Sequence, residues 1–128
     1  MVGGALKVSP ILEAGVKDTY TSYFPAGKWV SLNDFKEVIV GGRNATLQAR
    51  TTVNVHLRPG SLIPFQNNTD HSINKVAALN EKAITIVANR DEYGKSTGTV
   101  VLDKGNSRKE MYTDHYEYYQ LSVQAKTF

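Results

Sequence analysis

The chain has 128 residues, of which 41% are hydrophobic and 21% charged, an ordinary composition for a globular protein. This length fits one domain or two small ones, and it can bury about two-thirds of the unfolded surface, enough for a core without cross-links. The 15 basic and 12 acidic residues give a net charge of +3, and the basic ones form no concentrated stripe, which argues against nucleic acid as a partner. The absence of cysteine excludes disulfides, thiol nucleophiles and cysteine-based zinc sites.

The sequence carries no membrane or export signal of the usual kinds. No apolar run approaches the length of a membrane span, so we expect no membrane partner. The N-terminus lacks the basic and hydrophobic regions of a signal peptide. Because Met1 opens directly onto strand-like sequence, we expect either an engineered fragment or the C-terminal piece of a larger protein.

Short runs of strand-forming residues, separated by turns that contain glycine or proline, follow one another along the chain. In order, these runs occupy residues 3–13, 19–32, 36–40, 45–53, 55–66, 83–88, 98–103 and 111–125. The run 19–32 contains the turn Ala26-Gly27-Lys28 and is predicted to be a β-hairpin, whereas residues 73–82 could form one short helical turn. The pattern predicts an all-β fold, an antiparallel β-sandwich of short strands in one unit or two small ones. It excludes a catalytic (β/α) barrel within the chain.

The stretch 55–66 is the most informative part of the sequence. Val55 and Leu57 alternate with polar His56 and Arg58, which is typical of a half-buried strand. Pro59-Gly60 then marks a turn, because proline presets one backbone angle and glycine accepts the positive φ that follows. Pro64 cannot donate to a ladder, so the second run is predicted to be an edge strand, a bulge or a strand end. The stretch therefore predicts a hairpin or a sharp corner between two strands.

Residues 55–66 also resemble the "VHLRGG-x-ILP" segment that follows the catalytic barrel in α-glucosidases of glycoside hydrolase family 31. Three further segments are similar to family patterns and occur in the same order. Residues 1–12 resemble "FM-x-G-x-ALL-x-SPVL", residues 23–29 "Y-[FL]-P-x-G-x-W", and residues 98–107 "G-x-L-x-x-DDGES". The match spans nearly the entire chain.

The sequence departs from the family pattern at several positions. Pro59 stands where a glycine is usual, which stiffens the turn and removes a backbone donor, and Lys104 and Asn106 replace acidic residues. The family's distal domain normally continues well past the position of Phe128. The resemblance therefore implies a proximal β-sandwich domain over residues 1–66, a linker over 67–82 and the start of a distal β domain over 83–128. A truncated fragment and a divergent paralogue both fit this reading.

The resemblance implies a non-catalytic chain. Family 31 enzymes hydrolyse α-glucosidic bonds with retention, which requires two carboxylates about 5–5.5 Å apart. The family's two aspartates lie on the barrel, upstream of residue 1, so we expect no catalytic residue, cofactor or metal ligand here. The implied partner is the catalytic (β/α)8 barrel of the parent enzyme. The implied location is the secretory pathway, either lysosomal or extracellular.

Other polar clusters are better explained as solvated loops. Asp70-His71 and Asp114-His115 are carboxylate–imidazole neighbours, but neighbours on a strand point to opposite faces and cannot converge on a metal. No serine lies in a nucleophile-elbow motif. The carboxylates that might pair across strands are those of Asp91, Glu92, Asp103 and Glu110.

Aromatic and basic residues offer candidate contacts with a sugar or with the barrel. His56 and Arg58 are two apart on one predicted strand, and we favour a contact with the missing barrel over an exposed pair. Trp29 and Tyr119, together with Tyr112, Tyr116 and Tyr118, could form a sugar-stacking platform, since an aromatic ring suits the apolar side of a sugar. The preferred interpretation is that Trp29 is packed and that Tyr119 faces out, while Tyr116 and Tyr118 face the core. The alternative function is a carbohydrate-binding β-sandwich module that uses surface aromatics, with an oligosaccharide as its partner.

Two acceptor sequons for N-glycosylation occur, at Asn44 and Asn67. If the parent protein is secreted or lysosomal, both are expected at the surface.

Overall fold

A computed structural model describes residues 1–49, 51–66, 78, 83–102 and 116–125. The strands in this part of the chain are β1 (Leu6–Ser9), β2 (Thr19–Phe24), β3 (Lys28–Ser31), β4 (Val38–Val40), β5 (Arg43–Gln48), β6 (Asn54–Leu57), β7 (Ser61–Gln66), β8 (Ile84–Asn89), β9 (Lys95–Leu102) and β10 (Glu117–Gln124). Their pairing is antiparallel except for a parallel contact between β7 and β9. The predicted all-β, antiparallel fold is confirmed.

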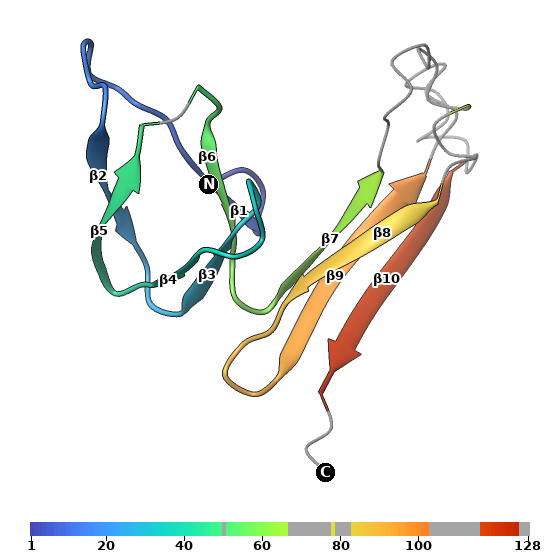
Figure 1. Ribbon diagram of the computed structural model, residues 1–128. Helices are drawn as coiled ribbons and strands as arrows, with labels where there is room; N and C mark the ends of the chain where they lie inside the picture. The colour runs from blue at the N-terminus through green and yellow to red at the C-terminus, as the bar shows by residue number, and fades with distance from the viewer. Residues whose placement is uncertain (50, 67–77, 79–82, 103–115, 126–128) are drawn as a thin grey trace.

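The N-terminal region, residues 1–57, is a small sandwich (Figure 1). One sheet has the strand order β1-β6-β3-β4, and the other consists of β2 and β5. Alternation along β2 and β5 turns Phe24 and Leu47 inward, where they meet Trp29 and Ile39 of the larger sheet in one buried cluster. The rings of Phe24 and Trp29 lie edge to face with their centroids 5.8 Å apart, a favourable aromatic geometry.

The hairpin predicted over residues 19–32 is wrong. The turn at Gly27 is present, with a positive φ of 117°, but β2 pairs with β5 while β3 pairs with β4 and β6. Pro25 lacks the N–H that would continue the β2 ladder, and its carbonyl accepts the Trp29 indole N–H at 2.8 Å. Because Phe24 and Trp29 must both reach the same core, the chain crosses here from one layer to the other.

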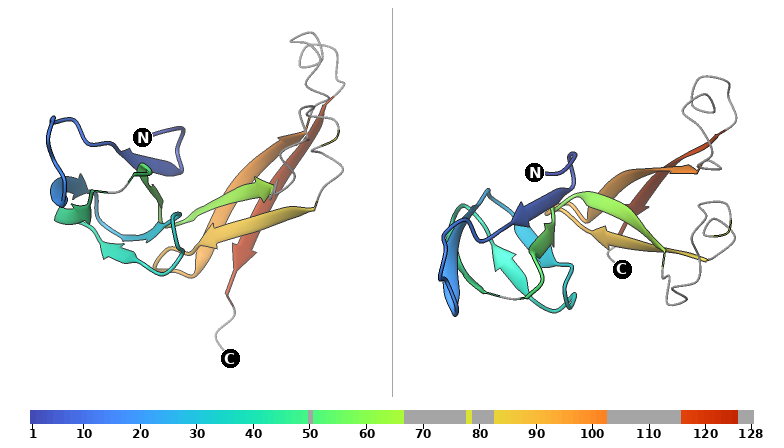
Figure 2. Two further views of the ribbon diagram at one scale, coloured as in Figure 1. Left: turned by 45° about the horizontal axis from the view of Figure 1, so that its top comes forward. Right: turned by 90° about the horizontal axis from the view of Figure 1, so that it is seen from above.

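The C-terminal region is a four-stranded sheet with the order β10-β9-β7-β8, which extends to one side of the sandwich (Figures 1 and 2). β7 pairs with β8 from Ser61 to Gln66 and touches β9 at Ser61↔Thr97. The last strand before the predicted linker therefore belongs to the same sheet as the strands after it. The division of the chain at residue 66 stays a prediction.

The stretch 55–66 was predicted to be either a hairpin or a sharp corner. It forms the sharp corner, because β6 and β7 lie in different sheets. Gly60 has the positive φ expected of the turn, 77°. Its N–H donates to the Asn89 carbonyl at 2.8 Å, and its own carbonyl accepts the Thr97 N–H at 3.0 Å. The Asn89 side-chain amide donates to the Lys28 and Leu57 carbonyls at 2.8 and 2.9 Å. This network fixes the corner.

Pro64 fits the geometry of the strand that it interrupts. It faces Ile86 of β8, whereas the register between β7 and β9 is confined to Ser61↔Thr97. The missing N–H of Pro64 is tolerated because β7 is no longer in register with β9 at this position.

Several sequence expectations fall outside the described residues. These are the linker over 67–82 and the helical turn over 73–82, apart from Ala78, which is helical. The others are Asn67, Asp70-His71, Asp103, Lys104, Asn106, Glu110, Tyr112 and Asp114-His115.

Candidate functional site

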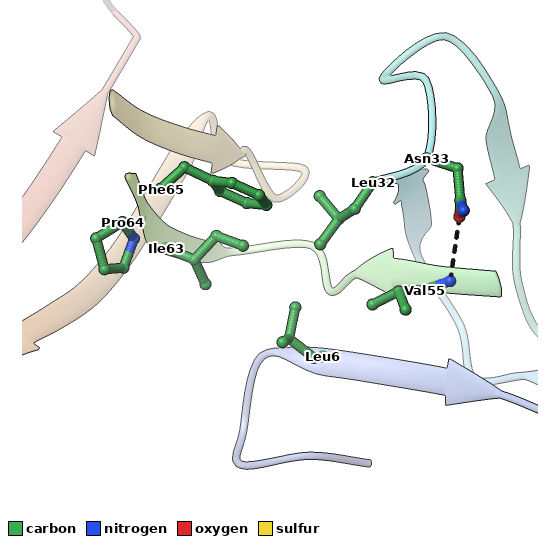
Figure 3. Close-up of a pocket in the computed structure, with 7 residues that line it drawn as sticks. All are labelled: Leu6, Leu32, Asn33, Val55, Ile63, Pro64 and Phe65. Carbon is green, nitrogen blue, oxygen red and sulfur yellow. Dashed lines mark hydrogen bonds between the residues drawn. The ribbon is translucent and has the colours of Figure 1, made fainter. Parts of the chain in front are cut away.

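An open apolar groove of about 490 Å³ lies where the N-terminal sandwich meets β7 (Figure 3). Its lining residues are Leu6, Leu32, Asn33, Val55, Ile63, Pro64 and Phe65. They come from β1, β6, β7 and the loop after β3, so the groove exists only because the corner at residues 58–60 brings β7 beside the larger sheet. The lining is overwhelmingly apolar, and Asn33 supplies its one polar side chain.

Phe35 extends the apolar surface beyond the groove. Its ring lies edge to face with that of Phe65, centroids 6.1 Å apart, and 51% of its surface is exposed. Phe35 also has a φ of +59°, a region that bulky side chains rarely adopt and that costs about 1–3 kcal/mol. A strained backbone that presents an aromatic ring to solvent indicates a binding surface better than a folding requirement.

Polar groups hold the loop that carries Phe35. The Asp34 carboxylate accepts the backbone N–H groups of Lys36 and Glu37 at 3.0 and 3.2 Å, and the Phe35 N–H donates to the Ser31 carbonyl at 3.0 Å. Asn33 connects the loop to β6, since its side chain accepts the Val55 N–H and donates to the Val53 carbonyl, both at 3.3 Å. The groove wall is therefore fixed by hydrogen bonds.

The two faces of β6 have different environments. Val55 lines the groove, whereas Asn54 and His56 point into the sandwich and are buried. The His56 ring lies edge to face with Phe24 at 4.9 Å. Because His56 has no exposed surface, it cannot contact a sugar or another domain, and that part of the sequence interpretation is wrong. Alternation placed the polar residues outside, but the second sheet of the sandwich covers their face.

A polar layer surrounds this buried face. The Lys7 ammonium donates to the Ser9 and Ser22 hydroxyls at 3.0 and 2.9 Å and lies 4.7 Å from the centroid of the Phe24 ring. The Asn54 amide donates to the Tyr20 hydroxyl at 2.9 Å, and Tyr20 in turn donates to the Ser9 carbonyl. Burial lowers the pKa of Lys7. These groups satisfy one another, which is how a sandwich with a polar interior remains stable.

The remaining predicted contact residues are dispersed. Trp29 is 2% exposed, which confirms that it is packed and removes it from any sugar platform. Arg58 follows β6 and is exposed, with Nη1 3.5 Å from the Gly4 carbonyl. Tyr119 is exposed on β10, and its hydroxyl donates to the Glu117 carboxylate at 2.7 Å. This hydrogen bond, together with the charge of Glu117, raises the pKa of Tyr119.

Tyr116 and Tyr118 do not face a core. They are 38% and 58% exposed, so the prediction that they point inward is wrong. β10 is the last strand of its sheet, and nearly all of its side chains are exposed on both faces. Alternation along a strand is the same whether or not a second layer covers one of its faces.

Asn44 lies on β5 and is exposed, as the sequon predicted. Within the described ranges, no group of three or more His, Asp or Glu side chains converges as a metal site would require. No helix among the described residues is long and apolar enough to cross a membrane.

Sequence reasoning missed the groove. Leu32, Ile63 and Phe65 read as ordinary strand residues, and Phe35 as part of a loop. The available signal was Asn33-Asp34-Phe35, because a large apolar residue after two turn-forming residues is an unusual choice for an exposed loop. The groove-lining residues come together only because of the angle between β6 and β7 at residues 58–60, and the sequence does not specify this angle.

Comparisons with known proteins agree with the fold. Residues 1–63 match the family model "Glycosyl hydrolase family 31 C-terminal domain". The chain is 34% identical over 110 residues to a probable alpha-glucosidase of Oryza sativa subsp. japonica, covering 84% of this chain and 12% of the relative. It is 32% identical over 127 residues to the lysosomal alpha-glucosidase of Rattus norvegicus, covering 82% of this chain and 12% of that relative. The chain thus spans about an eighth of the length of these relatives.

Solved structures share the fold at lower identity. A GH31 dextranase of Flavobacterium johnsoniae superposes with a TM-score of 0.73 at 24% identity, covering 98% of this chain and 15% of the dextranase. The glucosidase II alpha subunit superposes with a TM-score of 0.75 at 16% identity, covering 94% of this chain and 13% of the subunit. These structures show a shared fold, and the family match over residues 1–63 together with the similarity to the rice and rat relatives shows that the chain belongs to the C-terminal β-domain region of glycoside hydrolase family 31.

Proposed function

We propose that this chain is the non-catalytic C-terminal β-sandwich region of an α-glucosidase-like glycoside hydrolase, which braces the catalytic barrel and shapes its rim. The proposed parent activity is hydrolysis of α-glucosidic bonds. The relatives that carry the name alpha-glucosidase support this proposal, and the chain corresponds to only about 12% of their length. The relatives include lysosomal enzymes, which supports placing the parent in the secretory pathway or lysosome.

The apolar groove is the observation that carries the proposal. A lining of Leu6, Val55 and Ile63 with the exposed rings of Phe35 and Phe65 suits another protein surface, because burying apolar area is the main favourable term in association. A large exposed apolar patch is itself unusual on a protein that works alone. The groove presents an amide but no carboxylate pair, so binding suits it better than hydrolysis.

The position of the N-terminus supports the barrel as the occupant. Val2 exchanges backbone hydrogen bonds with Leu6, and Leu6 lines the groove. The N-terminus lies beside β1 (Figure 1). In a longer family enzyme, polypeptide that precedes Met1 would therefore enter next to the groove.

The alternative function is a carbohydrate-binding module, and the exposure of Tyr118 and Tyr119 favours it. These neighbours point to opposite faces of β10, however, so they do not form one platform, and Trp29 is buried. Titration with maltooligosaccharides separates the two functions. Saturable binding that is lost in Tyr119→Ala would favour the module.

A chimera tests the docking role. In the rice relative, the matched region is replaced by this chain, and activity on maltose is followed after heating. We expect an active chimera in which Phe35→Asp lowers the temperature of half-inactivation, since it places a charge in a buried interface. Phe35→Asp is a sharp probe because Phe35 is half exposed in the chain alone and aspartate tolerates its positive φ better than phenylalanine.

Tyr93→Asp is the matched control, because Tyr93 is an aromatic residue 74% exposed in the turn between β8 and β9, and it does not line the groove. Equal inactivation temperatures for Phe35→Asp and Tyr93→Asp would contradict the proposal that the groove is the docking surface. The isolated chain is assayed in parallel on maltose and on a chromogenic α-glucoside. Turnover comparable to that of an intact enzyme would contradict a non-catalytic role.

A further inference from the structure

The outer face of the β2–β5 sheet has an unusual make-up. The side chains that alternation turns outward are all exposed, and they are Thr19, Thr21 and Tyr23 on β2 and Asn44, Thr46 and Gln48 on β5. The register places them opposite one another as Thr19↔Gln48, Thr21↔Thr46 and Tyr23↔Asn44. The face therefore consists of hydroxyl and amide groups around one large aromatic ring.

Asn44 and Thr46 of this face are the acceptor and the hydroxyl position of a sequon, Asn44-Ala45-Thr46. Both are exposed, whereas Ala45 between them packs against the core cluster. A group attached to Asn44 Nδ2 would extend away from the sandwich, over side chains no larger than Gln48 except for Tyr23. The fold thus leaves room for a glycan without disturbing the core.

Tyr23 is the second observation. It is 59% exposed and lies directly opposite Asn44, where cross-strand Cβ atoms are about 4.5–5.5 Å apart. The faces of this exposed ring are apolar and interact weakly with water, but they can pack against the apolar side of a sugar ring.

We infer that Asn44 carries an N-linked glycan whose first sugar packs on the ring of Tyr23. In the transfer, Asn44 Nδ2 attacks C1 of a lipid-pyrophosphate-linked oligosaccharide. The C1–oxygen bond to the pyrophosphate breaks as the Nδ2–C1 bond forms, and Nδ2 loses one proton to the transferase or solvent. The inference rests on the secretory location in the proposed function, although it concerns a different face from the groove.

The glycan would also protect this sheet. β2 and β5 form a two-stranded sheet, so in the described part of the chain each has an outer edge without a neighbour. Open edges are templates for pairing with other chains. A glycan on Asn44, at one end of this face, makes such an approach sterically unfavourable there, and it leaves the groove free, because no residue of β2 or β5 lines the groove.

The experiment expresses the full chain behind an added signal sequence in yeast, together with a secreted reference glycoprotein that shows active glycosylation. Digestion with peptide-N-glycosidase in ¹⁸O-labelled water converts each glycan-bearing asparagine into labelled aspartate, which peptide mass spectrometry locates. We expect the label at position 44, and its loss in Asn44→Gln and in Thr46→Ala. An unlabelled Asn44 beside a glycosylated reference overturns the inference. Because the signal is supplied, this result is independent of whether the groove docks a barrel.

A second measurement tests the packing on Tyr23. In an Asn67→Gln background, the Tm is compared between glycosylated chain from yeast and bare chain from bacteria. We expect the glycan to raise Tm by a few degrees, and at least half of that gain to disappear in Tyr23→Ser. Tyr118→Ser, the substitution of an equally exposed tyrosine on β10, is expected to preserve the gain. An equal gain with and without Tyr23 overturns the packing.

Discussion

The N-terminal sandwich and the C-terminal sheet bury their side chains to very different extents. In the sandwich, Phe24, Trp29 and Leu47 are at most 2% exposed, because two sheets cover each other. In the C-terminal sheet, Leu62 and Val100 are buried, but β10 is exposed along both faces. The comparison indicates that the first region makes its own core, whereas the second is a single sheet in which few of the described side chains are buried.

One close backbone approach holds the strands of the C-terminal sheet together, and one side chain connects this sheet to the sandwich. A Cβ on Gly98 of β9 would overlap the Leu62 carbonyl oxygen of β7, so these two strands can approach as they do only because residue 98 is glycine. Asn89 of β8 donates to carbonyls of the sandwich. The following predictions test this division, from the largest expected effect to the smallest.

Trp29→Ala should cost about 3–5 kcal/mol of the free energy of unfolding, since it removes the largest fully buried side chain of the sandwich. Urea denaturation followed by far-UV circular dichroism measures the loss. Tyr118→Ala on β10 should change the free energy by no more than about 0.5 kcal/mol. Similar losses for the two variants would break the comparison between the regions.

Gly98→Ala should separate β7 from β9, because the added methyl group would overlap the Leu62 carbonyl. Hydrogen exchange is expected to accelerate at amides of the C-terminal sheet and to remain unchanged in β2 and β5. Gly4→Ala is the control, since a Cβ there meets nothing within 4 Å. Accelerated exchange throughout the chain would show that the two regions unfold as one unit.

Asn89→Ala should cost about 1–3 kcal/mol, because the Lys28 and Leu57 carbonyls lose a donor in a largely buried position. Urea denaturation of this variant beside Gln120→Ala, an exposed amide on β10, measures the difference. A cost no greater than that of Gln120→Ala would show that Asn89 does not secure the corner.

Glu117→Gln should lower the titration midpoint of Tyr119 toward its ordinary value of 10.0, since the hydrogen bond to Glu117 and the charge of Glu117 are the two largest causes of the raised pKa. Above pH 10 the folded chain retains a proton that the unfolded chain has lost, so this group makes stability fall as the pH rises. The substitution should reduce that fall. Carbon-13 NMR of the tyrosine Cζ atoms follows the titration, and an unchanged midpoint would contradict the assignment.

The sequence predicted the local structure better than the packing. The turn at Pro59-Gly60, the turn at Gly27 and the strands around them follow from backbone preferences of single residues, and all are present. The partner of each strand does not follow from such preferences. The predicted hairpin of β2 with β3 failed because Phe24 and Trp29 share a core from opposite layers, a long-range requirement.

The candidate site shows the same limit. Alternation along β6 correctly separates Val55 from His56, but it cannot say which of the two faces the second sheet of the sandwich covers. His56 is therefore buried, while Val55 lines a groove whose other wall comes from β7. Exposure on β10 was missed for the converse reason, since Tyr118 alternates like a core residue on a strand whose face remains open.

The left-handed backbone of Phe35 has an evolutionary consequence. Replacement by glycine or asparagine would relax the loop, so drift away from phenylalanine is favoured whenever selection on this position is lifted. The identity of residue 35 in closely related sequences would then indicate whether the groove is under selection. On the proposed docking role, retained phenylalanine would mark lineages in which the groove binds another protein surface, and its loss would mark lineages in which the groove does not.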